Sequence, residues 1–151
     1  MKTRVLLLPS ALVAMQIGTL PLAAQSSDTG AVVEKAPELL LELNALQPSD
    51  KGCRMTFVVT NDLGAELDQA AFEIALFNDL GLVDRLTVLD FKDLPVGKTK
   101  VTRFDLAGAD CAKVSRVLIN TATECKGAGV EPRACIRQLR TQSRSGTQFG
   151  T

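Results

Sequence analysis

Apolar and polar residues alternate along several short segments of the chain, which is the pattern of half-buried β-strands. In residues 54–60, Met55, Phe57 and Val59 share one face, and the other face contains the polar residues Arg54, Thr56 and Thr60. Residues 72–77 show the same alternation, with Phe72, Ile74 and Leu76 on one face. The pattern predicts strands at 39–44, 54–60, 72–77, 82–89, 98–106 and 113–121, with a candidate edge strand at 136–141.

Turn sequences separate these segments. The tetrapeptide Asn-Asp-Leu-Gly occurs twice, at 61–64 and 78–81, each time just after an apolar strand. Asn and Asp side chains start tight turns, and Gly supplies the positive φ that closes them. The second copy predicts a hairpin between Phe77 and Leu82. Short strands separated by turns predict an all-β fold, an antiparallel β-sandwich of about seven strands.

Two segments also fit a helix. Residues 63–72 contain alanines and leucines that suit a helical turn between strands. Residues 134–144 place Ile136, Leu139 and Arg140 at helical spacing, which leaves the final element open between helix and strand.

The start of the chain has the organisation of a secretory signal peptide. A basic Met-Lys-Thr-Arg start leads into an apolar run that closes on Ala23 and Ala24. Pro9, Gly18 and Pro21 interrupt the run, which disfavours the alternative of an uncleaved membrane anchor. We therefore expect cleavage after Ala24 and a periplasmic or secreted protein that meets the membrane only through its leader.

The domain organisation follows from these assignments. We predict a signal peptide at 1–24, a flexible lead-in at 25–37, a β-sandwich domain at 38–141 and a flexible tail at 142–151. About 127 residues after the leader are sufficient for one domain with its own core.

Composition narrows the function. The chain contains no His, Trp or Tyr, and so lacks the commonest general base and metal ligand and the rings that usually stack on sugars. The 17 basic and 17 acidic residues balance. Because the leader contains Lys2 and Arg4, its removal leaves a net charge of −2, which argues against a nucleic-acid partner. We expect no enzyme activity, no catalytic residue, no cofactor and no metal.

The four cysteines predict two disulfides, because an even set in an exported chain is typical of a disulfide framework. No C-x-x-C motif is present, and the spacings do not suit a tetrathiolate metal site, the alternative use of four cysteines. Three pairings are possible. Cys53 opens one predicted strand and Cys111 follows a later one that would lie antiparallel beside it, whereas Cys125 and Cys135 flank a glycine-bearing loop. We therefore favour the pairs Cys53–Cys111 and Cys125–Cys135.

Two charged clusters could carry chemistry. Glu66, Asp68 and Glu73 belong to an acidic stretch, but they lack calcium-loop spacing and are more simply carboxylates of turns and solvent-facing positions. Arg137, Arg140 and Arg144 would share one face of a helix and form a contact for an anionic partner; the alternative is a solvated basic edge that discourages aggregation.

One family resemblance adds to this interpretation. Residues 57–61 read Phe-Val-Val-Thr-Asn, residues 74–78 read Ile-Ala-Leu-Phe-Asn with Gly81 behind them, and residues 94–97 read Leu-Pro-Val-Gly before Phe104. This order resembles the small immunoglobulin-like modules of the FxLYD type found in exported bacterial proteins. Here Ile74, Phe77 and Asn78 replace the Phe, Tyr and Asp of that motif. The resemblance spans about residues 39–121 and implies an immunoglobulin-like fold, with no particular activity.

Together these observations predict a non-enzymatic interaction or accessory module of the bacterial cell envelope, held by two disulfides, whose partner is an envelope or periplasmic protein. A soluble binder of an anionic glycan, lipid or small ligand is the alternative. An enzyme would have to work through carboxylates alone.

Overall fold

The structure, a computed structural model, describes residues 35–151. The predicted signal peptide and residues 25–34 of the predicted lead-in lie outside the described residues. The strands are β1 (Glu38–Ser49), β2 (Gly52–Asp62), β3 (Leu67–Phe77), β4 (Val83–Leu94), β5 (Thr99–Ala107), β6 (Arg116–Lys126), β7 (Leu139–Ser143) and β8 (Gln148–Gly150). The helical elements are the 3-10 turn η1 (Cys111–Lys113) and the helix α1 (Ala134–Arg137).

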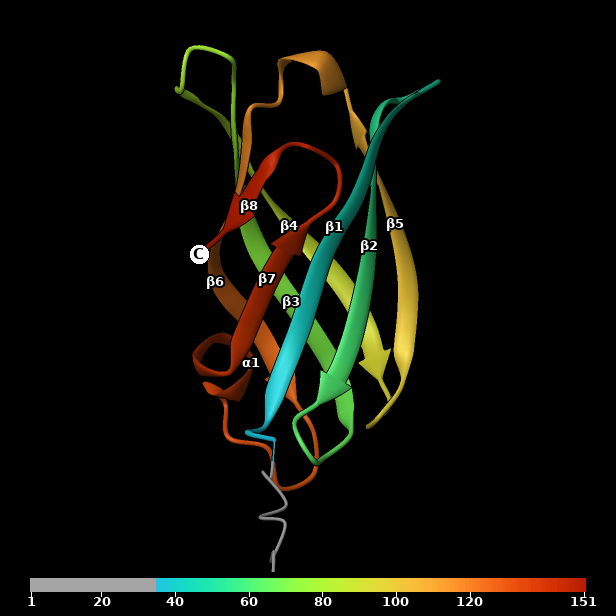
Figure 1. Cartoon of the computed structure of the whole chain (residues 1–151), viewed down its shortest axis with the longest axis vertical. Coiled ribbons are helices and arrows are strands. Elements are labelled where there is room, and N and C mark those ends of the chain that lie inside the picture. Colours follow the sequence, from blue (N-terminus) through green and yellow to red (C-terminus); the bar gives the residue numbers. More distant parts are fainter. Residues whose placement is uncertain (1–34) are drawn as a thin grey trace, which may run out of the picture. The chain divides into compact units, whose positions relative to one another are not determined.

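The strands form two four-stranded sheets, with the orders β5-β2-β1-β7 and β4-β3-β6-β8 (Figure 1). The pairings among β1 to β6 are all antiparallel, but β7 runs parallel to β1 and β8 runs parallel to β6. The two sheets are therefore mixed, and the prediction of a purely antiparallel fold is wrong for these two strands. The chain passes from one sheet to the other between β7 and β8. Strand β7 forms the edge beside β1 in the first sheet, and β8 forms the edge beside β6 in the second.

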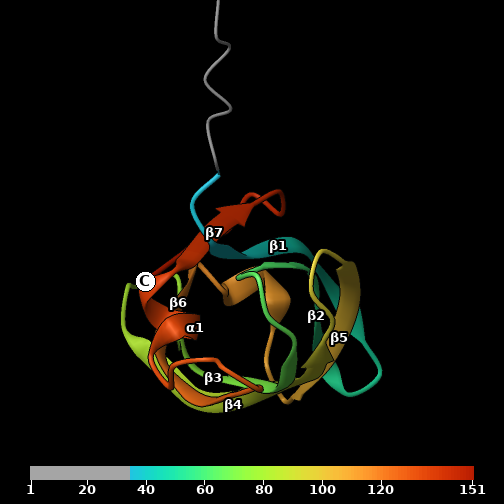
Figure 2. The same cartoon turned by 90° about the horizontal axis from the view of Figure 1, so that it is seen from below.

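The two sheets face each other around one apolar core (Figure 2). Met55, Phe57 and Val59 are fully buried on β2, as the alternation predicts. Phe72, Ile74 and Leu76 on β3 are the predicted inward set of the opposite sheet and are also buried.

Aromatic rings connect the two layers of the core. The ring of Phe57 on β2 meets that of Phe91 on β4 edge to face, with centroids 5.5 Å apart. Phe91 also contacts the rings of Phe72 and Phe104 in the same manner. Such edge-to-face contacts add about 0.5–1.5 kcal/mol each to the burial of the rings. The sixth phenylalanine, Phe77, lies outside this group, and the Arg116 guanidinium sits 5.2 Å above its ring.

Of the two segments that also fit a helix, the first forms a strand and the second contains both a helical turn and a strand. From Leu67 the segment 63–72 is extended and belongs to β3, because its neighbours β4 and β6 supply backbone partners on both sides. In segment 134–144 a single helical turn, α1, ends at Arg137 and β7 begins at Leu139.

Residues 142–151 differ from the prediction of a flexible tail. Strand β7 continues to Ser143, and β8 pairs with residues 116–118 of β6. Phe149 on β8 packs against the core, with its ring centroid 5.7 Å from that of Phe57. The sandwich therefore extends to Gly150, beyond the predicted boundary at 141.

Neither helical element of residues 35–151 has the length and apolar character needed to cross a membrane.

Candidate functional site

Both predicted disulfides are present. Cys53, the second residue of β2, is bonded to Cys111, which follows β5, the antiparallel neighbour of β2. Cys125 near the end of β6 is bonded to Cys135 in α1, so the second disulfide closes the loop between these two elements. With these bonds the described residues contain no free cysteine, which agrees with an oxidising compartment.

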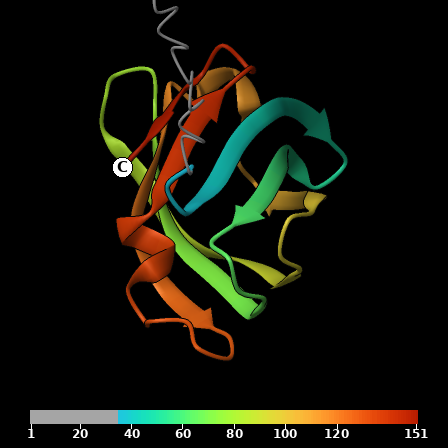
Figure 3. The same cartoon turned by 60° about the horizontal axis from the view of Figure 1, so that its bottom comes forward.

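The loop held by Cys125–Cys135 covers the first Asn-Asp-Leu-Gly turn at one end of the sandwich (Figure 3). A Cβ built on Gly127 would lie 2.0 Å from the carbonyl oxygen of Glu66, so only glycine permits this close approach. Leu63 and Val130 pack against the core from the two sides of a small cavity of about 160 Å³. This end of the domain is therefore closed by its own chain.

The second Asn-Asp-Leu-Gly turn lies in the β3–β4 hairpin, at the end of the sandwich that carries η1 (Figure 1). Asn78 accepts hydrogen bonds at Oδ1 from the backbone N–H groups of Leu80 and Leu82, both at 3.0 Å. Gly81 adopts a φ of 74°, as the predicted hairpin requires. The tip extends into solvent, because the side chain of Leu80 is 77% exposed.

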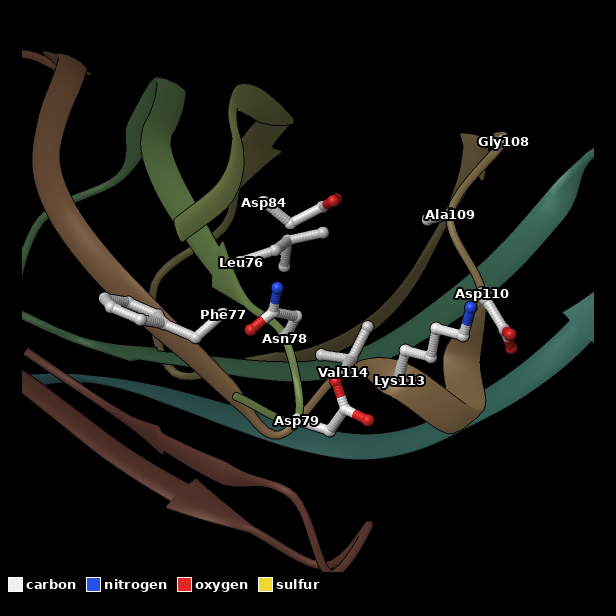
Figure 4. Close-up of a pocket in the computed structure, with 10 residues that line it drawn as sticks. All are labelled: Leu76, Phe77, Asn78, Asp79, Asp84, Gly108, Ala109, Asp110, Lys113 and Val114. Carbon is white, nitrogen blue, oxygen red and sulfur yellow. The ribbon is translucent and has the colours of Figure 1, made fainter. Parts of the chain in front are cut away.

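A cleft of about 450 Å³ lies between this hairpin and the segment around η1 (Figure 4). Three carboxylates, those of Asp79, Asp84 and Asp110, and one ammonium group, that of Lys113, line it. Asp84 is ion-paired with Arg85 at 3.1 Å, and Asp110 caps η1 by accepting the N–H of Ala112. No Ser, Cys or Thr side chain lines the cleft, so it contains no alcohol or thiol nucleophile.

Beside the cleft is a set of exposed apolar side chains that we name the β4 patch. Of the seven large apolar side chains that are exposed in residues 35–151, five fall within nine consecutive positions. They are Leu80, Leu82, Val83, Leu86 and Val88. Successive side chains of a strand point to opposite faces. Because Leu89 and Phe91 point into the core, Leu86 and Val88 project from the outer face of β4.

Strand β4 is also an edge strand, since β3 is its one neighbour in the sheet. Side chains cover both ends of this edge. Lys100 on β5 donates through Nζ to the carbonyls of Asp93 (2.7 Å) and Phe91 (3.3 Å). Arg85 reaches in the other direction and donates to the carbonyl of Ala107 on β5 at 2.8 Å. The stretch 86–90 between these contacts has no such cover in the described part of the chain.

The three arginines predicted as an anionic-partner contact do not share a helical face. Arg137 lies in α1, Arg140 in β7 and Arg144 after β7. Each has a carboxylate nearby: Arg137 pairs with Glu131, Arg140 lies 4.0 Å from Glu38, and Arg144 lies 2.9 Å from Glu42. Intramolecular acids therefore neutralise much of the charge that this surface would offer to an anion.

Glu42 is the nearly buried member of this group. Its carboxylate accepts hydrogen bonds from Asn44 (2.8 Å), Gln142 (2.6 Å) and Arg144 (2.9 Å). The hydrogen bond from Asn44, followed by the bond and charge of Arg144, lowers the pKa of Glu42 below its ordinary value, against the opposing effect of burial. The network fastens β7 and the segment after it to β1.

The acidic residues Glu66, Asp68 and Glu73, considered as a calcium group, do not converge. Glu66 lies in the β2–β3 turn segment, whereas Asp68 and Glu73 lie on β3, and Glu73 accepts a hydrogen bond from Asn120 of β6. Within residues 35–151 no three Cys, Asp or Glu side chains are placed to hold a metal ion.

Comparisons with protein-family models, with curated proteins and with solved structures find no match for this chain.

The β4 patch is the feature that the sequence pattern did not identify. The strand itself was predicted, but the run from Leu82 to Leu89 does not alternate regularly, so it does not show which side chains face inward. The register with β3 contains irregularities at both ends of β4, and these change the face that each side chain takes. The exposure of Leu80 at the hairpin tip was the one available sequence signal, since a turn apex rarely reaches a core.

Proposed function

We propose that this protein is an exported, non-enzymatic interaction module of the cell envelope, which binds a partner protein through its β4 edge. The observation that carries the proposal is the β4 patch: five exposed apolar side chains within nine residues, next to an incompletely covered strand edge. Contiguous exposed apolar surface beside polar residues marks protein interaction sites, and an open strand edge offers unpaired backbone groups to a partner.

The chemistry of the charged groups favours binding over catalysis. The described clefts lack the side-chain combination of a nucleophile and an adjacent base, and the carboxylates of Asp84 and Asp110 are engaged in local contacts. The arginine surface is largely paired with Glu38, Glu42 and Glu131, which lowers its value for binding an anionic glycan or lipid.

The connectivity of the first six strands supports an immunoglobulin-like arrangement for this module. Strands β1, β2 and β5 lie in one sheet, as the first, second and fifth strands of immunoglobulin domains do. Strands β3 and β6 lie in the other sheet, as the third and sixth strands of those domains do. Strand β4 pairs with β3 rather than with β5. Cys53 forms its disulfide with Cys111, which follows β5, rather than with a cysteine on β6 in the opposite sheet. These are the points at which the module departs from antibody domains.

The two disulfides support an extracytoplasmic location. Without them a domain of this size would lose several kcal/mol of stability, and such bonds persist in the periplasm or outside the cell. A thiol-reactive reagent applied to the fractionated cell without reductant should leave all four cysteines unlabelled.

The test of the proposed function is capture of the partner in the native envelope. A tagged full chain, exported by its own N-terminal segment, is crosslinked in intact cells and purified under denaturing conditions. A tagged unrelated exported β-sandwich, expressed to the same level, is the matched control. We expect one envelope protein to be enriched at comparable amount with this chain and not with the control. Recovery of the uncrosslinked chain alone would contradict the proposal.

A further inference from the structure

The β3–β4 hairpin combines an open strand edge, exposed apolar side chains and an excess of acid, and this combination specifies what can dock there. The open stretch 86–90 reads Leu-Thr-Val-Leu-Asp and contains no lysine, proline or glycine that would protect it from pairing. The register with β3 is regular from Arg85 to Asp90 and irregular beyond both ends. The edge therefore offers a regular ladder of about one ordinary strand length.

We infer that this edge accepts an extended, basic and apolar segment of the partner protein, which adds as a fifth strand beside β4. Main-chain hydrogen bonds to the open edge would provide affinity, and alternate side chains of the added strand would pack beside Leu86 and Val88 on the outer face. This inference rests on the proposed function and names the class of partner segment that the same surface takes.

The basic character of the segment follows from charge complementarity. Residues 67–94 contain six acidic and two basic residues, a net charge of −4, and Lys100 of β5 adds one positive charge at one end of the edge. Asp84, Asp90 and Asp93 are ion-paired within the domain, but Asp79, beside the exposed Leu80, forms no ion pair with any residue from 35 to 151. Glu73 lies opposite Val88 on the outer face of the sheet, where its one hydrogen-bond donor is the neutral Asn120.

A second copy of this chain is a less suitable occupant. Two β4 edges brought together would place two hairpins of the same negative charge side by side, and like charges across a strand pair are destabilising. A lysine- or arginine-bearing strand would remove that repulsion. The other sheet edge at this side, β5, carries the single exposed apolar residue Val101 between Lys100 and Arg103, so it is the less apolar and more basic of the two.

The experiment uses the full chain with both disulfides oxidised and three synthetic nine-residue peptides. The probe peptide is Lys-Val-Thr-Val-Thr-Val-Thr-Val-Lys. One control peptide replaces both lysines by glutamate, and the other carries N-methyl groups on two central residues, which removes backbone donors and leaves the side chains in place. Affinity is measured by fluorescence anisotropy at low salt, and backbone amide hydrogen exchange locates the bound peptide.

We expect the lysine peptide to bind at least tenfold more tightly than the glutamate peptide and than the N-methylated peptide. Bound peptide should slow the exchange of the edge-facing amides of residues 86–90 at least tenfold. The double variant Leu86→Ser/Val88→Ser should weaken binding at least tenfold, whereas Val101→Ser, a matched loss of exposed apolar surface on β5, should leave it unchanged. Both Leu86 and Val88 are more than half exposed, so the double variant should keep its melting temperature.

Several outcomes would overturn the inference: protection of β5 or of neither edge, equal affinity for the lysine and glutamate peptides, or full affinity for the N-methylated peptide. The last comparison needs no variant and stands even where the double variant unfolds. A dimer that sedimentation detects in the peptide-free protein, and that Leu86→Ser/Val88→Ser abolishes, would assign the edge to a second copy instead. Cellular capture of a partner that is equal for wild type and this variant would overturn the β4 edge as the docking surface, and would leave standing only the proposal of an exported, non-enzymatic interaction module.

Discussion

The same tetrapeptide, Asn-Asp-Leu-Gly, forms a turn at two places in this domain, and the two turns share some features but serve different purposes. In both copies the Asn Oδ1 accepts the N–H group of the residue two positions later, and the Gly has a positive φ, 83° at Gly64 and 74° at Gly81. Their surroundings differ. Asn61 is 1% exposed and its turn is closed over by the domain, whereas the hairpin of Asn78 carries Leu80 into solvent.

The difference arises from contacts remote in sequence. Asn61 donates through Nδ2 to the carbonyls of Leu94 (2.7 Å) and Ala65 (2.9 Å), and the loop held by Cys125–Cys135 lies against Glu66. At the second turn Ser115 donates through its backbone N–H to the carbonyl of Phe77 and through Oγ to that of Asn78, but the tip at Leu80 stays in solvent. Four residues determine the shape of a turn, and the rest of the fold determines whether that turn is a structural support or a surface available for contact.

The largest expected effects come from the two disulfide variants, one of which removes the cover of the first turn. The double variant Cys125→Ala/Cys135→Ala should lower the free energy of unfolding by about 3 kcal/mol, since it opens a short covalent loop. Amide exchange at Leu63 should then approach the rate at Leu80. The double variant Cys53→Ala/Cys111→Ala is the control: it should cost about 4 kcal/mol in the same model, yet keep Leu63 protected. Chemical denaturation and hydrogen exchange check both; equal protection of Leu63 in the two variants would contradict this account of the cover.

The second test exchanges each asparagine for alanine. Asn61→Ala should destabilise the domain by about 2–3 kcal/mol, because it leaves the buried Leu94 carbonyl without a partner along with two further backbone groups. Asn78→Ala should cost about 1 kcal/mol, because solvent can replace its bonds at the exposed turn. Urea denaturation of the two variants measures the difference, and equal costs would show that burial does not separate the turns.

The leucines give a smaller contrast. Leu63 packs against the core, so Leu63→Ala should cost about 1–2 kcal/mol, whereas Leu80→Ala should leave stability within about 0.5 kcal/mol of wild type. Thermal denaturation is sufficient to compare them. A substantial loss on changing Leu80 would mean that the hairpin tip packs against the domain.

The smallest effect is a pH dependence that belongs to neither turn. The pKa of Glu42 is lower in the folded protein than in the unfolded chain, so its contribution to stability is complete above the ordinary glutamate value of about 4.3 and is lost as the pH falls through the folded-state pKa. Glu42→Gln should therefore destabilise the domain modestly at pH 7 and less at pH 3. Urea denaturation at pH 7 and pH 3 measures the free energy of unfolding of each variant. Asn78→Ala is the control, because its cost does not involve the Glu42 carboxylate and should be the same at both pH values. A cost for Glu42→Gln that is equal at both pH values would contradict the network described for this carboxylate.

The sequence predicted most of what depends on local pattern. The inward faces of β2 and β3 follow from alternation, and the hairpin at Asn78 follows from turn chemistry. The Cys53–Cys111 disulfide follows from the antiparallel placement of two strands, and Cys125–Cys135 from the glycine-bearing loop between these two cysteines. The edge strand expected at 136–141 corresponds in part to β7, but its parallel pairing with β1 was not expected. Strand β8 was missed, because it is three residues long and its pairing depends on a remote partner.

The candidate site was harder to anticipate. Exposure of Leu86 and Val88 depends on the pairing register of β4 with β3, which a single irregularly alternating segment does not encode locally. The spacing of Arg137, Arg140 and Arg144 would place them on one face if residues 134–144 formed a helix. In the fold the helix ends after one turn, and carboxylates on β1 and in the preceding loop take up their charges.

The pairing of β1 with β7 makes the end of the chain necessary for completing the domain. Glu42 finds its partner Gln142 across 100 residues of sequence, and β7 is the strand that covers one edge of β1. A chain that lacks residues 139–144 would therefore leave that edge of the leucine-rich strand β1 open, and the Glu42 carboxylate would lose Gln142 and Arg144. Residues 139–144 act as the closing step, so a truncated chain would display that edge to chaperones and proteases.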